Sequence, residues 1–322
     1  MSINRLHADA IINGAMQWLA SKQIVPPTRV TVQLGVGEFV SSQTQIIRHP
    51  QGSQIVVQGT APTEAPITGV VVADFTNPSA PVEGTRQPGW LYNSAGMLSV
   101  TANASARTSA RTADTTNNLA LIRARFPTVV RVTGNANAIT VNTNLAELNN
   151  LAILGEVTNT SSPLAVAASG FIQAGKWLAA GATGRSSVNI TGRMVCSDVA
   201  VFGGGTSNLL VATGSFSCSN IFSQGAGQFG LIIQESSSCS IGALIATGCG
   251  HSGLSVRVGS CLSQGLSGTV NNDIVLSGNG RRGLHLERMG SFEVTLTTTA
   301  PGVIDVQGNS WEGVFVDGLS RA

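Results

Sequence analysis

Charged side chains are scarce in this sequence. Only 16 acidic and 18 basic residues occur among 322, which is 11% of the chain, and the formal net charge is +2. A balance this close to zero gives no electrostatic reason to expect a nucleic-acid partner. No apolar run approaches the ~18 residues of a membrane-spanning helix, so membrane insertion is not expected. The opening MSINRLHADA also lacks the apolar core of a secretory signal.

Cysteine is rare as well. An odd number of cysteines without a C-x-x-C pair opposes a disulfide framework and a zinc site. We therefore expect no metal and no cofactor. All but Cys249 recur at nearly equal intervals, and we expect these four thiols to be buried and stacked at one position of a repeating coil. A redox or metal role is the alternative. The cysteines are Cys196, Cys218, Cys239, Cys249 and Cys261.

Glycine, by contrast, is abundant, and it recurs in a pattern. The motif G-x-G-x-x-G occurs at Gly225–Gly230, Gly248–Gly253 and Gly278–Gly283. A dinucleotide-binding loop would need a helix after its last glycine. Here an alternating apolar run follows each copy: GLII, GLSV and GLHL. A fourth segment, Gly308–Gly313, keeps only the outer glycines. An earlier one has Asn208 at the last position, where we expect a residue that tolerates positive φ.

The last glycines of these segments, at positions 230, 253, 283 and 313, recur at regular intervals, of which the first is somewhat shorter than the other two. Such a period, with short strands and no helix between them, is typical of a solenoid. We predict an all-β, single-stranded parallel β-helix, right-handed because parallel crossovers almost always are. Two inward stacks are expected on successive coils. They are Leu231, Leu254, Leu284 and Val314, and Ile233, Val256, Leu286 and Val316.

Three regions are predicted along the chain. Residues 1–59 would hold an N-terminal capping helix, at His7–Ala20, and the first coils, with strands at Val30–Leu34 and Ile55–Val57. Residues 60–118, rich in proline and then in small polar residues, would form a loop-rich excursion. Residues 119–322 would form the main coils. Leu145–Leu154 has a leucine stripe that leaves helix or strand open, and Leu262–Asn272 would bulge as a loop.

The candidate site lies between the inward positions of the later strands. Ile232, Ser255, His285 and Phe315 are expected to face solvent in one column, and Gln234, Arg257, Glu287 and Asp317 in another. Carboxylates of Glu287 and Asp317 roughly 5 Å apart would suit a retaining glycosidase, one of them with a raised pKa. Arg257, His285 and Phe315 are candidate glycan-binding residues, together with Trp311, which could stack on a sugar ring.

Three interpretations of this surface stay open: a solvated sheet face on which Arg257 offsets the repulsion between two acids, a glycan-binding surface, or a catalytic pair. Arg281 and Arg282 would suit an acidic glycan, although exposed arginines are common in turns. No serine–histidine–acid pattern is evident among the four histidines. His49 and His251 fall in turns, where surface or capping roles are expected.

Several stretches carry a resemblance. They are RVTVQLGVGEF, IIRHPQGSQIVVQG, NNLALIRARFPTVVRVTGN and LNNLAILGE, all in the first half. They resemble pectate-lyase-like β-helix proteins of bacteriophage tail fibres and tailspikes. The resemblance implies a homotrimer on the virion surface, assembled in the host cytoplasm, then extracellular, and attached to other tail or baseplate proteins. It also implies binding to a host surface glycan.

Two classes of function follow. The first is a structural virion protein that displays a host-receptor-binding β-helix, which the short, charge-poor chain favours. The second is a glycan depolymerase, a glycosidase or a lyase, acting on host surface polysaccharide. A bacterial cell-surface adhesin is a third, disfavoured by the missing signal sequence.

Overall fold

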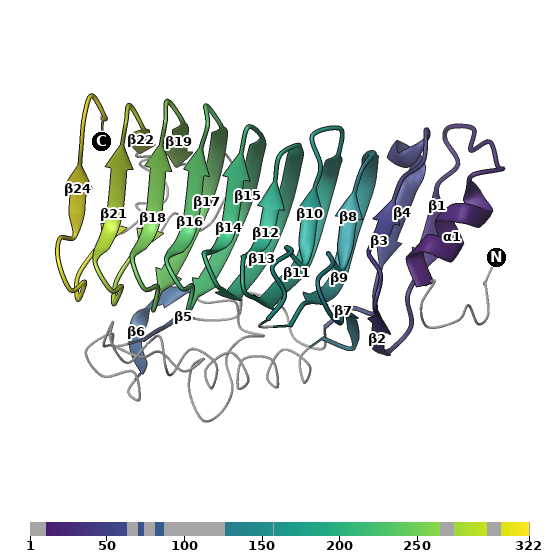
Figure 1. Ribbon diagram of the computed structural model, residues 1–322, viewed down its shortest axis with the longest axis horizontal. Helices are drawn as coiled ribbons and strands as arrows, with labels where there is room; N and C mark the ends of the chain where they lie inside the picture. The colour runs from purple at the N-terminus through teal and green to yellow at the C-terminus, as the bar shows by residue number, and fades with distance from the viewer. Residues whose placement is uncertain are drawn as a thin grey trace.

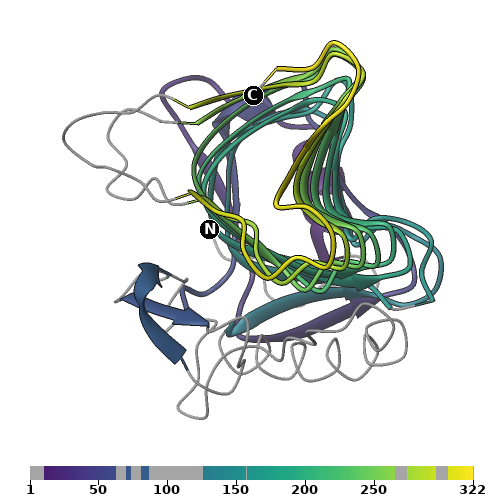
Figure 2. The same cartoon turned by 90° about the vertical axis from the view of Figure 1, so that its left-hand side faces the viewer.

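The computed structural model describes residues 11–62, 70–73, 81–86, 126–156, 158–264, 274–294 and 304–321. In them the chain winds into a parallel β-solenoid of about 7 turns. Figure 1 shows the coils side by side, and in Figure 2, viewed end-on, successive coils follow nearly the same outline. The predicted all-β parallel β-helix is therefore confirmed. Its right-handedness stays a prediction.

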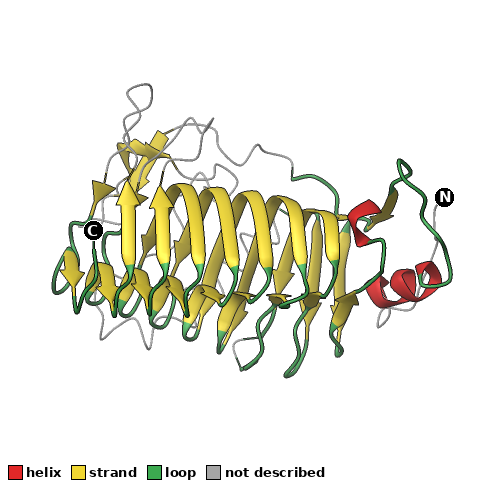
Figure 3. Ribbon diagram, turned by 90° about the horizontal axis from the view of Figure 1, so that it is seen from above, coloured by secondary structure: helices red, strands yellow, loops and turns green. Residues whose placement is uncertain are grey.

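Two parallel sheets form the walls of the solenoid (Figure 3). Sheet A contains β1 (Val30–Gln33), β2 (Gly37–Ser41), β4 (Ile55–Gln58), β7 (Thr128–Val132), β9 (Asn144–Leu154), β11 (Phe171–Thr183), β13 (Arg193–Gly204), β15 (Ser215–Gln224), β17 (Ser238–Thr247), β19 (Cys261–Gln264), β20 (Ile274–Val275), β22 (Ser291–Val294) and β23 (Ile304–Asp305). Sheet B contains β3 (Gln45–Ile47), β8 (Ile139–Val141), β10 (Leu164–Val166), β12 (Ser186–Ile190), β14 (Ser207–Ala212), β16 (Phe229–Gln234), β18 (Ser252–Arg257), β21 (Arg282–Glu287) and β24 (Val314–Val316).

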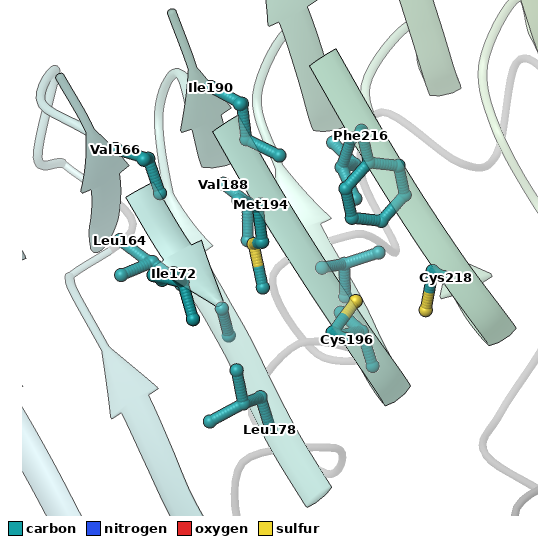
Figure 4. Close-up of a cluster of buried hydrophobic side chains, with 14 of the residues drawn as sticks. Leu164, Val166, Ile172, Leu178, Val188, Ile190, Met194, Cys196, Phe216 and Cys218 are labelled. Carbon is teal, nitrogen blue, oxygen red and sulfur yellow. The ribbon is translucent and has the colours of Figure 1, made fainter. Parts of the chain in front are cut away.

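Each strand pairs in register with its equivalent in the next coil. In sheet B, Leu231 pairs with Leu254, Leu254 with Leu284, and Leu284 with Val314. The second predicted stack, beginning at Ile233, has the same register. The members of both stacks on β16, β18 and β21 belong to one continuous apolar core, part of which is shown in Figure 4. On β24, Val314 and Val316 are 47% and 44% exposed.

The cysteine prediction is only partly right. Cys196 and Cys218 pair on adjacent strands and are buried side by side (Figure 4). The next coil is slightly longer, so Cys218 pairs with Ile241 and not with Cys239. Cys239 instead pairs with Phe216, two positions earlier along the strand. Cys261 pairs with Ser238 and is only partly buried, which puts it outside the stack.

The leucine-rich stretch that left helix or strand open is a strand, β9. This strand and β11 are long because they turn a corner at a residue in the left-handed region, Asn150 with φ 59° and Trp177 with φ 52°. After the corner, alternate residues point outward and form a second apolar cluster. Its central row is in register from coil to coil: Ala152, Ala179, Ala200, Phe222, Ile245 and Val275.

The glycine motifs form turns, as predicted, but the positive φ occurs at another position of the motif than the predicted last one. The first glycine of each motif takes the positive φ, between 66° and 67° at Gly225, Gly248, Gly278 and Gly308. The last glycine lies where rungs approach closely. A Cβ on Gly230, for example, would lie 2.5 Å from the carbonyl oxygen of Gly253. Asn208 is aligned with Gly230 but has no positive φ, which corrects the sequence prediction. Its amide bonds Gly204 N (2.9 Å) and Gln224 O (2.8 Å) instead.

A short helix covers the N-terminal end of the core, as predicted. Helix α1 (Ile11–Leu19) buries Ile12, Met16 and Leu19 against the first coils. Gln45 Oε1 accepts a hydrogen bond from the amide of Ile12 (3.0 Å). At the other end of the helix, the ring Nε2 of His49 bonds the carbonyl oxygen of Leu19 (3.1 Å), so His49 is a buried capping group.

Several predictions fall on parts of the chain that lie outside the described residues. These are residues 7–10 of the predicted helix, nearly all of the loop predicted at 262–272, and most of the excursion at 60–118. Within that excursion β5 (Val70–Ala73) and β6 (Pro81–Arg86) pair antiparallel. The described residues also include a 3₁₀ turn, η2 (Gly52–Gln54). In the described part of the chain no helix is long and apolar enough to cross a membrane.

Candidate functional site

Four rings stand in a row on the outward side of sheet B, on its last rungs. We name Phe229, His251, His285 and Phe315 the ring ladder. The ring centroids are 4.9 Å, 5.8 Å and 5.4 Å apart along the row. His285 and Phe315 are register partners on β21 and β24. The parallel register therefore brings together rings that lie far apart in the sequence, one from each of four successive coils.

The inner part of this surface is not solvent-exposed, contrary to the sequence prediction. Ile232 is 6% exposed, Ser255 0% and His285 6%. The long side chain of Arg257 lies along part of this surface. Its Nε donates a hydrogen bond to Ser255 Oγ (2.8 Å), and its guanidinium lies 4.4 Å from the ring centre of Phe229. An alternating pattern predicts which way a residue points, but neighbouring long side chains decide how much water reaches it.

The predicted ladder of charges begins with a close ion pair. Arg257 and Glu287 are register partners, and Arg257 Nε lies 3.2 Å from Glu287 Oε2. Arg288 Nε lies 3.2 Å from the other oxygen, Oε1. Asp317 follows on the next rung, its amide bonded to the carbonyl oxygen of Leu286 (2.9 Å). Two guanidinium groups therefore hold the Glu287 carboxyl in place on this surface.

Both histidines of the ring ladder are neutral at pH 7. Burial lowers the pKa of His251 to about 4, with further lowering by Arg281 and by His285. Burial also lowers the pKa of His285, as do Arg282 and Arg257, against the opposing effect of Glu287 and Asp317. Neutral imidazoles cannot supply positive charge here, so the positive charge of the surface belongs to its arginines.

The ring of His285 lies between a cation and an anion. Its Nε2 lies 3.4 Å from Arg282 Nη1 and 3.8 Å from Glu287 Oε2. Its Nδ1 is buried and has no hydrogen-bond partner among the described residues.

A second row runs along the glycine turns beside the ring ladder. We name Gln228, His251, Arg281 and Trp311 the turn row. Main-chain hydrogen bonds of 2.8 Å join each residue to the one before it. The guanidinium of Arg281 lies 4.7 Å from the ring centre of Trp311, which is 58% exposed. Arg282 lies 3.6 Å from the ring centre of Phe315 and forms an ion pair with Glu312 (2.9 Å).

The six site residues singled out from the sequence thus lie on three consecutive rungs of sheet B. They are Arg257, Glu287, Asp317, His285, Phe315 and Trp311. Sequence reasoning missed Phe229 and gave His251 only a surface or capping role. The signal was available: both lie in the glycine motifs, one or two positions before the last glycine. Extending the register from strand into turn would have aligned them with Arg281 and Arg282.

Metal binding gets no geometric support from this surface. Within the described ranges, no three histidine, cysteine, aspartate or glutamate side chains group closely enough to hold a metal ion.

The fold and this surface together define a parallel β-helix protein with a ring-rich and arginine-rich outward face. Comparison with protein-family models, with curated proteins and with solved structures found no match.

Proposed function

We propose that this chain is a structural protein whose β-helix displays a glycan-binding surface, formed by the ring ladder and the turn row. The observation that carries the proposal is Trp311, whose large ring stays 58% exposed on a rigid turn beside Phe315 and two arginines. Exposed aromatic rings stack well on the apolar faces of sugars, and neighbouring N–H groups bond the sugar hydroxyls.

Rigidity supports the same proposal. Main-chain hydrogen bonds to the neighbouring rung hold the backbone of Trp311, and the ion pair with Glu312 holds Arg282. A surface held in place before binding loses little conformational entropy when a ligand arrives. A repeating surface with ~4.8 Å between rungs also suits an extended chain ligand better than a compact one.

The test is binding of purified protein to immobilised bacterial surface polysaccharides, measured with Trp311→Ala beside the wild type. We expect a loss of at least about tenfold in affinity, or ~1.4 kcal/mol. Trp18→Ala is the matched control, because Trp18 is also exposed (41%) but lies on α1 at the other end of the solenoid. Equal losses in both variants, or no binding by the wild type, would refute the proposal.

A glycan depolymerase is the second candidate, on the observation that Glu287 and Asp317 occupy adjacent rungs. In a retaining mechanism these two side chains would take the two carboxyl roles, nucleophile and general acid. In that case the wild type lowers the viscosity of a host polysaccharide and releases reducing ends, or unsaturated ends if it is a lyase. Glu287→Gln and Asp317→Asn then abolish both signals while binding persists.

We also propose that the protein belongs to a phage virion, as a homotrimeric tail fibre or tailspike-like component held by other tail or baseplate proteins. This proposal rests on the resemblance of the first coils alone. Immunogold labelling of intact particles tests the location, and sedimentation equilibrium of the purified chain tests the trimer. Unlabelled particles would refute the virion role without touching the glycan-binding proposal.

A further inference from the structure

One arginine of the candidate site, Arg281, has no ion-pair partner among the described residues. On the last rungs of sheet B, Arg257, Arg281, Arg282 and Arg288 face the acids Glu287, Glu312 and Asp317. Arg257 and Arg288 share Glu287, and Arg282 pairs with Glu312. Arg281 takes part in none of the ion pairs found among the described residues; its guanidinium rests on the ring of Trp311 instead. The surface therefore keeps one cation without a carboxylate, beside its most exposed ring.

The geometry of Arg281 leaves its donors available. Both Arg281 and Trp311 are exposed, and they occupy the same turn position on adjacent rungs. A guanidinium over a ring uses its flat face for the contact, so that its N–H groups point outward around the edge. These donors form the planar fork that binds a carboxylate through two parallel hydrogen bonds.

We infer that the ligand of this surface is an anionic saccharide, whose carboxylate binds Arg281 and whose ring packs against Trp311. The inference rests on the proposed function and narrows it to sugars that carry a carboxylate. A neutral glycan would leave the Arg281 guanidinium unpaired beside its hydroxyls, whereas a carboxylate would neutralise it. Charge-assisted hydrogen bonds are stronger than those between neutral groups, so the discrimination should be measurable.

The experiment uses four probes: polygalacturonate, alginate, hyaluronate and polysialic acid, each beside its carboxyl-reduced, neutral derivative. Binding of the whole chain is measured by titration calorimetry. We expect at least one acidic form to bind the wild type tenfold or more tightly than its reduced partner, and Arg281→Gln to remove that preference. Trp311→Ala should weaken acidic and reduced forms by similar factors, because it removes the ring and not the charge.

The matched control is Arg193→Gln. Arg193 is also an exposed arginine over a ring, that of Phe171, but it lies on sheet A. If Arg193→Gln weakens binding as much as Arg281→Gln, the attraction is unspecific and the inference fails. If reduced and acidic forms bind equally well, the inference fails while the glycan-binding proposal stands. If neither form of any probe binds, both fail.

Discussion

The most direct test of the solenoid is a single methyl group at Gly250, the third residue of the second glycine motif. A Cβ there would lie 2.1 Å from the carbonyl oxygen of Gly227 in the coil before, against 3.4 Å or more for ordinary contact. Gly250 has no positive φ, so alanine suffers no backbone strain of its own at this position. The obstacle is main chain, which cannot swing aside. The two rungs must move apart by more than an ångström.

That movement breaks hydrogen bonds between rungs. The amide of Gly250 donates to Ala226 O (2.9 Å), and the amide of His251 donates to Gln228 O (2.8 Å). Losing both costs about 2 kcal/mol, at ~1 kcal/mol each. Overpacking adds about 1–3 kcal/mol. We therefore expect Gly250→Ala to lower the free energy of unfolding by about 3–5 kcal/mol, which corresponds to a fall of roughly 10 °C in Tm.

Thermal unfolding followed by far-ultraviolet circular dichroism measures this. Gly35→Ala is the matched control, since a Cβ on Gly35 meets nothing within 4 Å and its φ is not positive. There alanine should be neutral or stabilise by about 0.5 kcal/mol through the unfolded chain. If both variants have the same Tm as the wild type, the coils do not approach each other at Gly250 as described, and the stacking argument is wrong.

Three further predictions concern the corner and the site. Asn150 has φ 59°, so Asn150→Gly should leave the free energy of unfolding in urea unchanged. Asn150→Val should lower that free energy by about 1–2 kcal/mol, because a β-branched residue is strained at this φ. Equal free energies for the two variants would contradict the prediction. The pKa of His251 is about 4 when folded and 6.5 when unfolded, so the unfolded chain binds the proton first and stability falls as pH drops from 6.5 to 4. His251→Gln should flatten that part of the Tm–pH curve; an unchanged slope would refute the assignment. Glu287→Gln should lower the pKa of His285 in an NMR titration, because Glu287 supports its protonated form; an unmoved pKa would place the carboxylate elsewhere.

The repeat could be predicted from sequence because backbone geometry demands it. The last glycines of the motifs are spaced by the length of a coil, since a side chain there would collide with the next rung. Cysteine spacing wrongly predicted a single stack of four thiols, because no backbone geometry demands cysteine at one position. Any inward position accepts a small thiol, so Cys239 could move two positions away from the Cys196 and Cys218 stack while keeping a similar spacing in sequence.

The corner and the outward apolar row could not be predicted from sequence. Trp177 takes a left-handed φ of 52°, although tryptophan has no local preference for it; the strands that pair on both sides impose it. The row from Ala152 to Val275 has the same alternation as an inward row, and a pattern of period two does not distinguish inside from outside when both sides are apolar.

The candidate site lies on an outward column of sheet B, the one that contains Ser255, and the position of this column explains why its residues can vary. Inward columns keep apolar residues on every rung, because each must fill the same core: Leu231, Leu254 and Leu284 are nearly fully buried. The outward column beside them is free of that demand and changes from Ile232 through Ser255 and His285 to Phe315. In a solenoid the core therefore constrains one set of columns and leaves the other to vary rung by rung. Because adjacent rungs bring outward residues of the same column within contact distance, a few substitutions in those columns assemble rings and arginines into one surface without altering the coil.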